Sequence, residues 1–168
     1  AEPDPGLVRA AQAHLRSQPL SFEQKRMAPD AEGAMRRIPE EVRVEEGRAL
    51  ARTGDAGWSA EIERGLADGR VGDDVLDAAA DLVRAWNVPV TWVSAVPSRR
   101  RTQDGADDVV SDAVRRLAER LGLPFGAVLV RAADRPPQAE MRNAAQQVAN
   151  VRGAFAVTAQ PPSGPCLL

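Results

Sequence analysis

Residues 131–155, RAADRPPQAEMRNAAQQVANVRGAF, carry the most specific pattern in the chain. The segment opens with charged residues and two prolines, continues through a stretch rich in Ala, Gln and Asn, and ends in Asn-Val-Arg-Gly-Ala-Phe. Apolar runs lie before it at 125–130 and at its end at 154–157. Together they predict a strand, a loop stiffened by the prolines, a helix over 140–149 and a second strand.

The same alternation extends outward from this segment. Residues 90–96, VTWVSAV, form a nearly continuous apolar run that is typical of a strand buried on both faces of a sheet. Residues 107–121 have the apolar spacing of an amphipathic helix and are followed by Gly122, a suitable C-cap. Another strand is expected to begin at 166–168. Strands and helices in alternation predict an α/β fold with a parallel sheet.

The first 70 residues show weaker patterns. Residues 6–17 have Leu7, Ala10, Ala11 and Leu15 on one face, which predicts an amphipathic helix. A strand-like stretch at 20–24, a basic turn, and a strand around 42–44 that ends in a turn follow, and 58–66 and 73–86 are expected to be helices. We expect a small helical, winged-helix-like connector over 1–70 and the α/β domain over 71–168.

Composition limits the classes of function. The 168 residues are 43% hydrophobic and 27% charged with a net charge of -2, so the chain is expected to be globular and any nucleic-acid contact must come from local basic patches. The single cysteine, Cys166, excludes an intramolecular disulfide and a four-cysteine zinc site. We find no membrane-length apolar run and no signal peptide, which indicates a cytoplasmic protein. The absent initiator Met fits a processed chain or a fragment.

Two arginine-bearing loops are candidate phosphate sites. Ligands of open α/β sheets bind beyond the carboxyl ends of the strands, where Ser98, Arg99, Arg100 and Arg101 follow the strand at 90–96. Guanidinium groups suit phosphate oxygens because they present a fork of donors and keep their charge. Arg131 and Arg135 occupy the same place after the next strand, while Asp104, Asp107 and Asp108 weaken the local positive field. A solvated charged loop is the alternative.

Other catalytic patterns are absent from the sequence. It has no phosphate-binding G-x-x-x-x-G-K-[ST] motif, so we expect no ATPase site in this chain. His14 has no partner for metal binding or nucleophilic catalysis and is expected on a helix surface. Trp58, Trp86 and Trp92 are expected in the core rather than stacked on bases.

The strings at 93–101 and 131–155 resemble the phosphoribosyltransferase-like domain fused to the C-terminus of some bacterial RecQ-like DNA helicases. A more distant resemblance is to the competence-factor type of phosphoribosyltransferase. The match covers the second half of the chain well and the first half loosely, where Gly-Arg-Ala-Leu at 47–50 belongs to it. The resemblance implies pyrophosphate contact by Ser98 to Arg101 and places Asn150 and Arg152 in the family string. Alternatively, Asn150, Gly153 and Phe155 only fix a turn and fill the core.

In that family a strand followed by two acidic residues binds the ribose of phosphoribosyl pyrophosphate. The corresponding strand would begin at 165–168, where the given sequence ends, so the domain looks incomplete at its C-terminus. We therefore expect no transferase activity from these residues alone.

The sequence thus predicts an accessory C-terminal region of a RecQ-like ATP-dependent 3'-5' DNA helicase that acts in DNA repair or recombination. It would contact the backbone of single-stranded or forked DNA with low sequence specificity. Its other partners would be the remaining helicase domains, and its location would be the nucleoid. ATP and Mg²⁺ would belong to the parent helicase, and this chain would hold no cofactor. The alternatives are a phosphoribosyltransferase that binds phosphoribosyl pyrophosphate with Mg²⁺, and a protein-interaction module. The candidate binding residues are Lys25, Arg26, Arg36, Arg37, Ser98, Arg99, Arg100, Arg101, Arg131, Arg135, Asn150 and Arg152.

Overall fold

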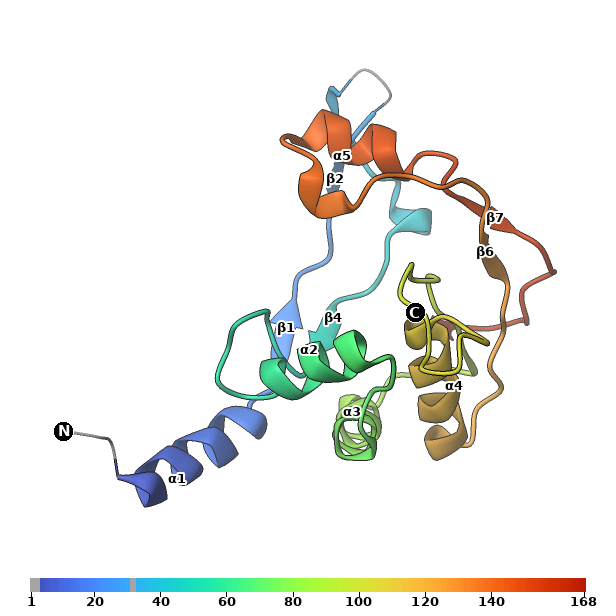
Figure 1. Cartoon of the computed structure of the whole chain (residues 1–168). Coiled ribbons are helices and arrows are strands. Elements are labelled where there is room, and N and C mark those ends of the chain that lie inside the picture. The colour runs from blue at the N-terminus through green and yellow to red at the C-terminus, as the bar shows by residue number, and fades with distance from the viewer. Residues whose placement is uncertain (1–3, 31–32) are drawn as a thin grey trace.

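The computed structural model describes residues 4–30 and 33–168 and shows a mixed α/β arrangement (Figure 1). Its α-helices are α1 (Pro5–Arg16), α2 (Ser59–Asp68), α3 (Asp73–Trp86), α4 (Val109–Leu121) and α5 (Ala144–Val151). Short 3-10 helices lie at Glu40–Val42 and Gln138–Glu140. The strands are β1 (Leu20–Phe22), β2 (Met27–Pro29), β3 (Met35–Arg37), β4 (Gly47–Ala49), β5 (Trp92–Val93), β6 (Leu129–Arg131), β7 (Phe155–Val157) and β8 (Cys166–Leu167).

The strands pair only two by two within the described residues, so the expected large parallel sheet is not seen there. Three pairs, β1 with β4, β2 with β3 and β6 with β7, are antiparallel. The pair of β5 and β8 is parallel, and a single parallel bridge joins Val93 to Phe125 on the other side of β5. The short α5 contacts β2 instead of crossing over a sheet, which agrees with the antiparallel return of β7 along β6.

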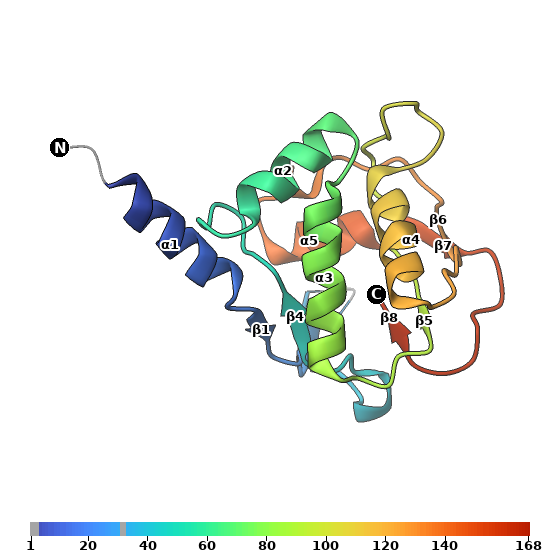
Figure 2. The same cartoon turned by 90° about the horizontal axis from the view of Figure 1, so that it is seen from below.

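The hydrophobic core lies between α3 and α4, which run side by side in both views (Figures 1 and 2). Its buried residues come from the segment just before α3, the start of α3 and the start of α4, and residues of α2 pack against them. Outside this core two ion pairs join α4 to α3: Arg116 to Asp73 and Arg120 to Asp77, both at 2.7 Å. Helix α2 therefore packs on helices that follow residue 70. The domain boundary expected at residue 70 stays a prediction. The core residues are Val71, Val75, Leu76, Val109 and Ala113.

The strand expected at 90–96 is confirmed as buried but is shorter than its apolar run. Residues 92–95 are all buried, yet only Trp92 and Val93 form a paired strand. Its polar groups are satisfied: the Ser94 hydroxyl donates to the Gly126 carbonyl at 2.8 Å, and Trp92 Nε1 donates to the Gly164 carbonyl at 3.0 Å. The length of β5 follows from its two short neighbours, because a strand extends only as far as a partner can accept its hydrogen bonds.

The helices predicted at 73–86 and 107–121 are confirmed, and both end at a left-handed C-cap. The helix predicted at 73–86 has the same bounds in α3, which ends at Asn87 in the left-handed conformation. The helix predicted at 107–121 begins slightly later, at Val109, and ends at the Gly122 C-cap as expected. The helix predicted at 140–149 is displaced, because the Asn143 side chain accepts from the Gln146 amide and caps α5 there.

Two other local predictions were wrong. No strand forms around 42–44: Val42 belongs to the 3-10 turn Glu40–Val42, in which its amide donates to the Pro39 carbonyl at 3.2 Å. Val42 and Val44 are 65% and 70% exposed, so no neighbouring strand covers the alternating valines. The basic turn expected after residue 24 is a β2–β3 hairpin, in which Pro29 sits at the strand end.

The described ranges contain no helix that is both long enough and apolar enough to cross a lipid bilayer.

The contact between Gly126 and Trp92 gives a test of this packing. A Cβ added at Gly126 would lie 2.9 Å from the Trp92 ring, so Gly126→Ala is expected to overpack the site and to cost about 1–3 kcal/mol of unfolding free energy. Urea denaturation measures this loss. Gly47→Ala is the matched control, because its nearest neighbour would be Phe22 Cβ at an ordinary 3.5 Å. Equal stability of the two variants would contradict the described packing of β5.

Candidate phosphate-binding cleft

The loop between β5 and α4, called the arginine loop below, folds back on itself and is closed by hydrogen bonds of its own backbone. The Thr102 amide donates to the Asp107 carbonyl at 3.0 Å, and the Val109 amide donates to the Arg100 carbonyl at 2.9 Å. A bridge between Arg101 and Asp108 joins the same two arms. The three consecutive arginines therefore lie on an ordered support rather than on a free loop.

Asp108 joins the arginine loop to α4. One carboxylate oxygen, Oδ1, accepts from the Ser98 amide at 2.9 Å and from the Ser111 and Val110 amides at 3.0 and 3.2 Å. Asp108 is thus the N-cap of α4 and also fixes the start of the arginine loop. Burial disfavours its charged form, but the hydrogen bonds from Ser111 and Ser98 outweigh burial and hold the pKa of Asp108 below its ordinary value.

Gly69 contacts the arginine loop from the other side. It ends α2 with a φ of +76°, and a Cβ at this position would lie 2.8 Å from the Arg101 carbonyl oxygen. Only glycine combines the left-handed conformation with such a close approach of two backbones. The end of α2 therefore sets where the arginine loop can lie.

The second arginine-bearing loop, which follows β6, is held by α5. Asn150 Nδ2 donates to the Pro136 carbonyl at 3.0 Å and to the Gln138 side chain at 2.8 Å. Arg135 Nη2 donates to the Arg152 carbonyl at 3.3 Å. Asn150 and the Arg152 backbone thus position the proline loop, which favours the structural interpretation of these two residues.

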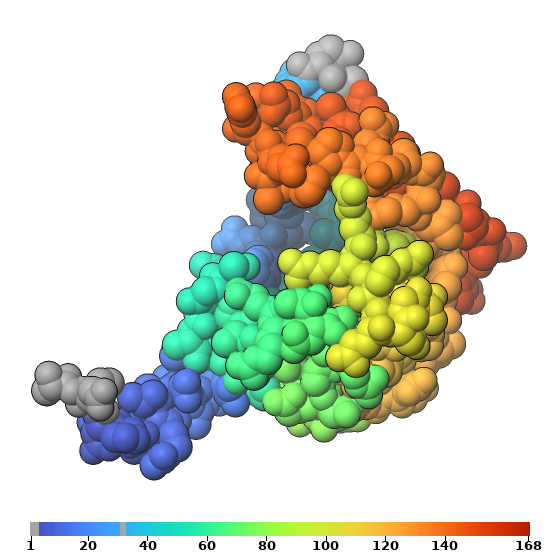
Figure 3. All heavy atoms as spheres, in the orientation of Figure 1, coloured from blue at the N-terminus to red at the C-terminus, as the bar shows by residue number. Residues whose placement is uncertain are grey.

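The two loops meet although some 30 residues separate them. Arg99 forms an ion pair with Asp134 at 2.9 Å and donates a hydrogen bond to the Arg135 carbonyl. The space-filling view shows the loop around residue 100, in yellow, reaching the orange segment that follows β6 (Figure 3). This contact closes one side of a cavity of about 540 Å³.

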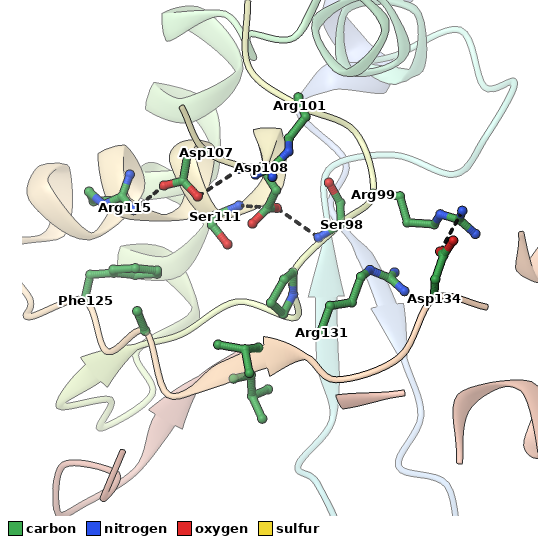
Figure 4. Close-up of a pocket in the computed structure, with 14 residues that line it drawn as sticks. Ser98, Arg99, Arg101, Asp107, Asp108, Ser111, Arg115, Phe125, Arg131 and Asp134 are labelled. Carbon is green, nitrogen blue, oxygen red and sulfur yellow. Dashed lines mark hydrogen bonds and ion pairs between the residues drawn. The ribbon is translucent and has the colours of Figure 1, made fainter. Parts of the chain in front are cut away.

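The cavity has two ends of different chemistry (Figure 4). Arg99, Arg131 and Asp134 lie at one end, and Asp107, Arg115 and Phe125 lie at the other. At the second end Arg115 pairs with Asp107 at 2.5 Å and lies 5.1 Å from the centre of the Phe125 ring. Four arginines and three aspartates line the cavity in all, so its charge is mixed with a small positive excess. The lining residues include Ser98, Arg99, Arg101, Asp107, Asp108, Ser111, Arg115, Phe125, Arg131 and Asp134.

Arg131 is the most constrained of these arginines. Its guanidinium lies 5.2 Å from the centre of the Phe155 ring, across the β6–β7 pair. Its Nε is buried and has no hydrogen-bond partner among the residues that the structure describes. A buried donor left unpaired is costly, and an anion in the cavity would offer an acceptor to this guanidinium.

Other predicted residues lie elsewhere. Arg100 is exposed and is not part of the cavity lining. Lys25 and Arg26 line a separate hollow beside α5, which they share with Glu23, Glu45 and Glu46. Arg36 and Arg37 belong to β3, where Arg36 pairs with Asp30 at 2.9 Å. The predicted basic residues therefore form two groups, and acidic neighbours accompany both.

The lining residues that were not predicted from the sequence include Ser111, Arg115 and Phe125. Ser111 and Arg115 are one helical turn apart on α4, and Asp108 caps this helix where it meets the arginine loop. Recognising Asp108 as the cap could therefore have identified them from the sequence. Phe125 gave no such signal within its apolar run. No group of three or more His, Cys, Asp or Glu side chains placed to hold a metal ion occurs among residues 4–30 and 33–168.

Comparison with models of known protein families gives no match, and searches of curated proteins and of solved structures find no similar protein either.

The role of Asp108 predicts a pH-dependent loss of stability. Because its pKa is lowered in the folded state, the charged carboxylate stabilises the fold above the ordinary Asp pKa of about 4, and this contribution is lost as the pH falls further. Asp108→Asn keeps a side chain that can cap α4 and loses the charge of the acceptor, so it is expected to lower the unfolding free energy by about 1 kcal/mol at pH 7, with a much smaller difference from wild type at pH 3.

Urea denaturation at both pH values measures the effect. Asp68→Asn, which removes an equal charge from the exposed end of α2, is the control at pH 7. A difference between Asp108→Asn and wild type that is the same at pH 3 and pH 7 would refute a role for the ionised carboxylate.

Proposed function

We propose that this chain is an accessory region of a RecQ-like ATP-dependent 3'-5' DNA helicase and binds the DNA backbone through the cleft between its two arginine-bearing loops. The observation that carries the proposal is the meeting of Arg99 and Arg131, from distant parts of the sequence, at one cavity. The helicase attribution depends on the resemblance of 93–101 and 131–155 to the helicase-fused domain. A winged-helix-like connector and a phosphoribosyltransferase-like domain belong to the same proposal.

The ion pair of Arg99 suits it to exchange partners. Asp134 is 85% exposed and the Arg99 side chain is 41% exposed, so the pair is worth little in water. A phosphate can therefore displace the carboxylate at small cost and receive the paired donors of the guanidinium. The hydrogen bond from Arg99 to the Arg135 carbonyl keeps the side chain in place before the ligand arrives.

The chemistry of the cleft favours contact without sequence readout. Its charged donors are guanidinium groups, and its backbone is engaged in loop contacts, so phosphate and sugar are the DNA groups it suits best. The hairpin residues Lys25, Arg26 and Arg37 would add a weaker, second contact, because glutamates line the same hollow as the first two.

DNA binding is the first test. We expect single-stranded and forked DNA to bind at about 50 mM salt and to bind far more weakly at about 200 mM, because binding releases counterions. Arg99→Gln with Arg101→Gln is expected to lower the affinity about tenfold or more and to reduce the salt slope by roughly 0.7–0.9 per lost phosphate contact. Fluorescence anisotropy with labelled DNA measures both quantities.

The matched control is Arg64→Gln with Arg142→Gln, which removes the same charge from exposed positions outside the cleft. Equal losses in the two double variants would assign binding to total charge and not to the cleft. Absence of binding at low salt would remove the DNA proposal altogether.

The size of the cavity favours a second candidate, a small sugar phosphate such as phosphoribosyl pyrophosphate with Mg²⁺. A volume of about 540 Å³ is typical of a small-molecule site. The loop after β5 also begins at the carboxyl end of a parallel strand pair, where α/β folds bind such ligands.

Thermal unfolding separates the two candidates. A small-ligand site predicts a rise in Tm with phosphoribosyl pyrophosphate and Mg²⁺ that Mg²⁺ alone does not give, and that Arg99→Gln with Arg101→Gln abolishes. The DNA proposal predicts no specific rise beyond that given by pyrophosphate at equal concentration. A rise that persists in the double variant would place the ligand outside the cleft.

A further inference from the structure

A hollow lies between the later turns of α3 and α4, beyond the hydrophobic core at their first turns. It has a volume of about 230 Å³ and is lined by side chains from β4, α3, β5, α4 and β8. The strand β8 ends beside these two helices (Figure 2). Leu82, Val83 and Trp86 continue the apolar side of α3 along the hollow, and all three are only half-buried. The described residues thus leave this part of the apolar side of α3 without full cover.

The hollow is separate from the arginine cleft. No described residue lines both of them. Helix α4 presents Ser111 and Arg115 to the cleft, whereas it presents Val114 and Leu117 to the hollow. A ligand in the hollow would therefore bind independently of the phosphate proposed for the cleft.

The lining of the hollow suits an apolar group better than water. The Ser94 hydroxyl donates to the Gly126 carbonyl at 2.8 Å, and the Ser94 amide donates to the Leu167 carbonyl at 2.9 Å, so the donors of this polar residue are already engaged. A buried water needs about two to four polar partners, and a cavity of about 150 Å³ lined by aliphatic and aromatic side chains stays dry and binds benzene. On that scale, 230 Å³ holds an apolar group of roughly nine heavy atoms.

The opening of the hollow carries a cation. Among the described residues that line it, only Arg48 has a charged side chain, and Arg48 is exposed, so it stands where the hollow meets solvent. It lies on β4 opposite Ser21, and its guanidinium donates a hydrogen bond to the Ser21 hydroxyl. It also forms an ion pair with Glu46 at 3.1 Å, but this glutamate is 51% exposed, so the pair is weak. The carboxylate of a ligand can therefore replace Glu46 at small cost.

We propose that the hollow binds a small apolar carboxylate, whose apolar body lies between α3 and α4 and whose carboxylate pairs with Arg48. Burial of the apolar body drives binding, because apolar surface of the ligand and of the lining leaves water together. Arg48 selects an anion over a neutral molecule of the same shape, and it orients the ligand with its charge toward the opening. The described residues that line the hollow include no acidic side chain that would repel this anion.

Isothermal titration calorimetry with octanoate tests the proposal. Octanoate is expected to bind at one site per chain. Hexanoate is expected to bind about 15-fold more weakly, because each methylene group that is no longer buried costs about a fourfold loss of affinity. Pyrophosphate is not expected to compete with octanoate, since the arginine cleft is a separate cavity. Competition between the two would place octanoate in the cleft and overturn the proposal.

Two substitutions examine the two parts of the site, with 1-octanol as the uncharged probe of the same chain length. Ala79→Leu places a larger side chain in the hollow and is expected to abolish the binding of both octanoate and 1-octanol. Arg48→Gln is expected to lower the affinity for octanoate about tenfold, because a charge-assisted hydrogen bond is lost, and to leave the affinity for 1-octanol unchanged.

Ala149→Leu and Arg64→Gln are the matched controls, because both residues are exposed helix positions outside the hollow, and both variants are expected to bind octanoate as the wild type does. Circular dichroism shows whether Ala79→Leu is folded, and if it is not, the comparison of octanoate with 1-octanol in Arg48→Gln decides. Three results would overturn the proposal: no binding of octanoate at about 10 mM, undiminished binding by folded Ala79→Leu, or an Arg48→Gln variant that binds octanoate as the wild type does or loses 1-octanol equally.

Discussion

A single buried carboxylate, that of Asp108, organises the loop between β5 and α4. Asp108 caps α4 and at the same time accepts from the Ser98 amide, so the end of the buried β5 segment and the start of α4 are fixed by one group. The arginine loop has little freedom between these two points, and Gly69 limits it further from the side of α2. The backbone position of Arg99 is therefore set by these anchors, and its side chain is held by Asp134 and the Arg135 carbonyl.

The charge of the cleft decides what it can bind. A pocket lined only by arginines would hold anions tightly and indiscriminately, whereas here Asp107 and Asp134 each occupy one guanidinium. Only the contacts of Arg99 with Asp134 and the Arg135 carbonyl join the two loops, and both ion pairs weaken the field that a distant polyanion senses. Arg131, with its Nε buried beneath the cleft and its guanidinium against Phe155, contributes a charge that no described carboxylate neutralises through an ion pair. The cleft therefore offers its guanidinium groups to a phosphate at short range and exerts little attraction at long range.

Sequence reasoning succeeded where local chemistry decides the structure. The bounds of α3 agree with the helix predicted at 73–86, and the burial of 92–95 agrees with the apolar run at 90–96. It failed where pairing partners decide: the apolar run gave only a two-residue β5, β6 and β7 paired antiparallel, and the β2–β3 hairpin was taken for a loop. The two arginine loops were expected at one rim, and they do meet. The ion pair to Asp134 and the contribution of Phe125 depend on tertiary contacts that no sequence pattern encodes.

The most direct test of the central claim, that both loops hold one phosphate group together, is an NMR titration of the chain with inorganic pyrophosphate. The amide signals of Ser98 and of residues 131–135 are expected to shift together with one dissociation constant, and the Arg99 and Arg131 side-chain Nε signals are expected to shift with them. Shifts confined to one loop, shifts with two different dissociation constants, or shifts only in the β2–β3 hairpin would contradict a shared site.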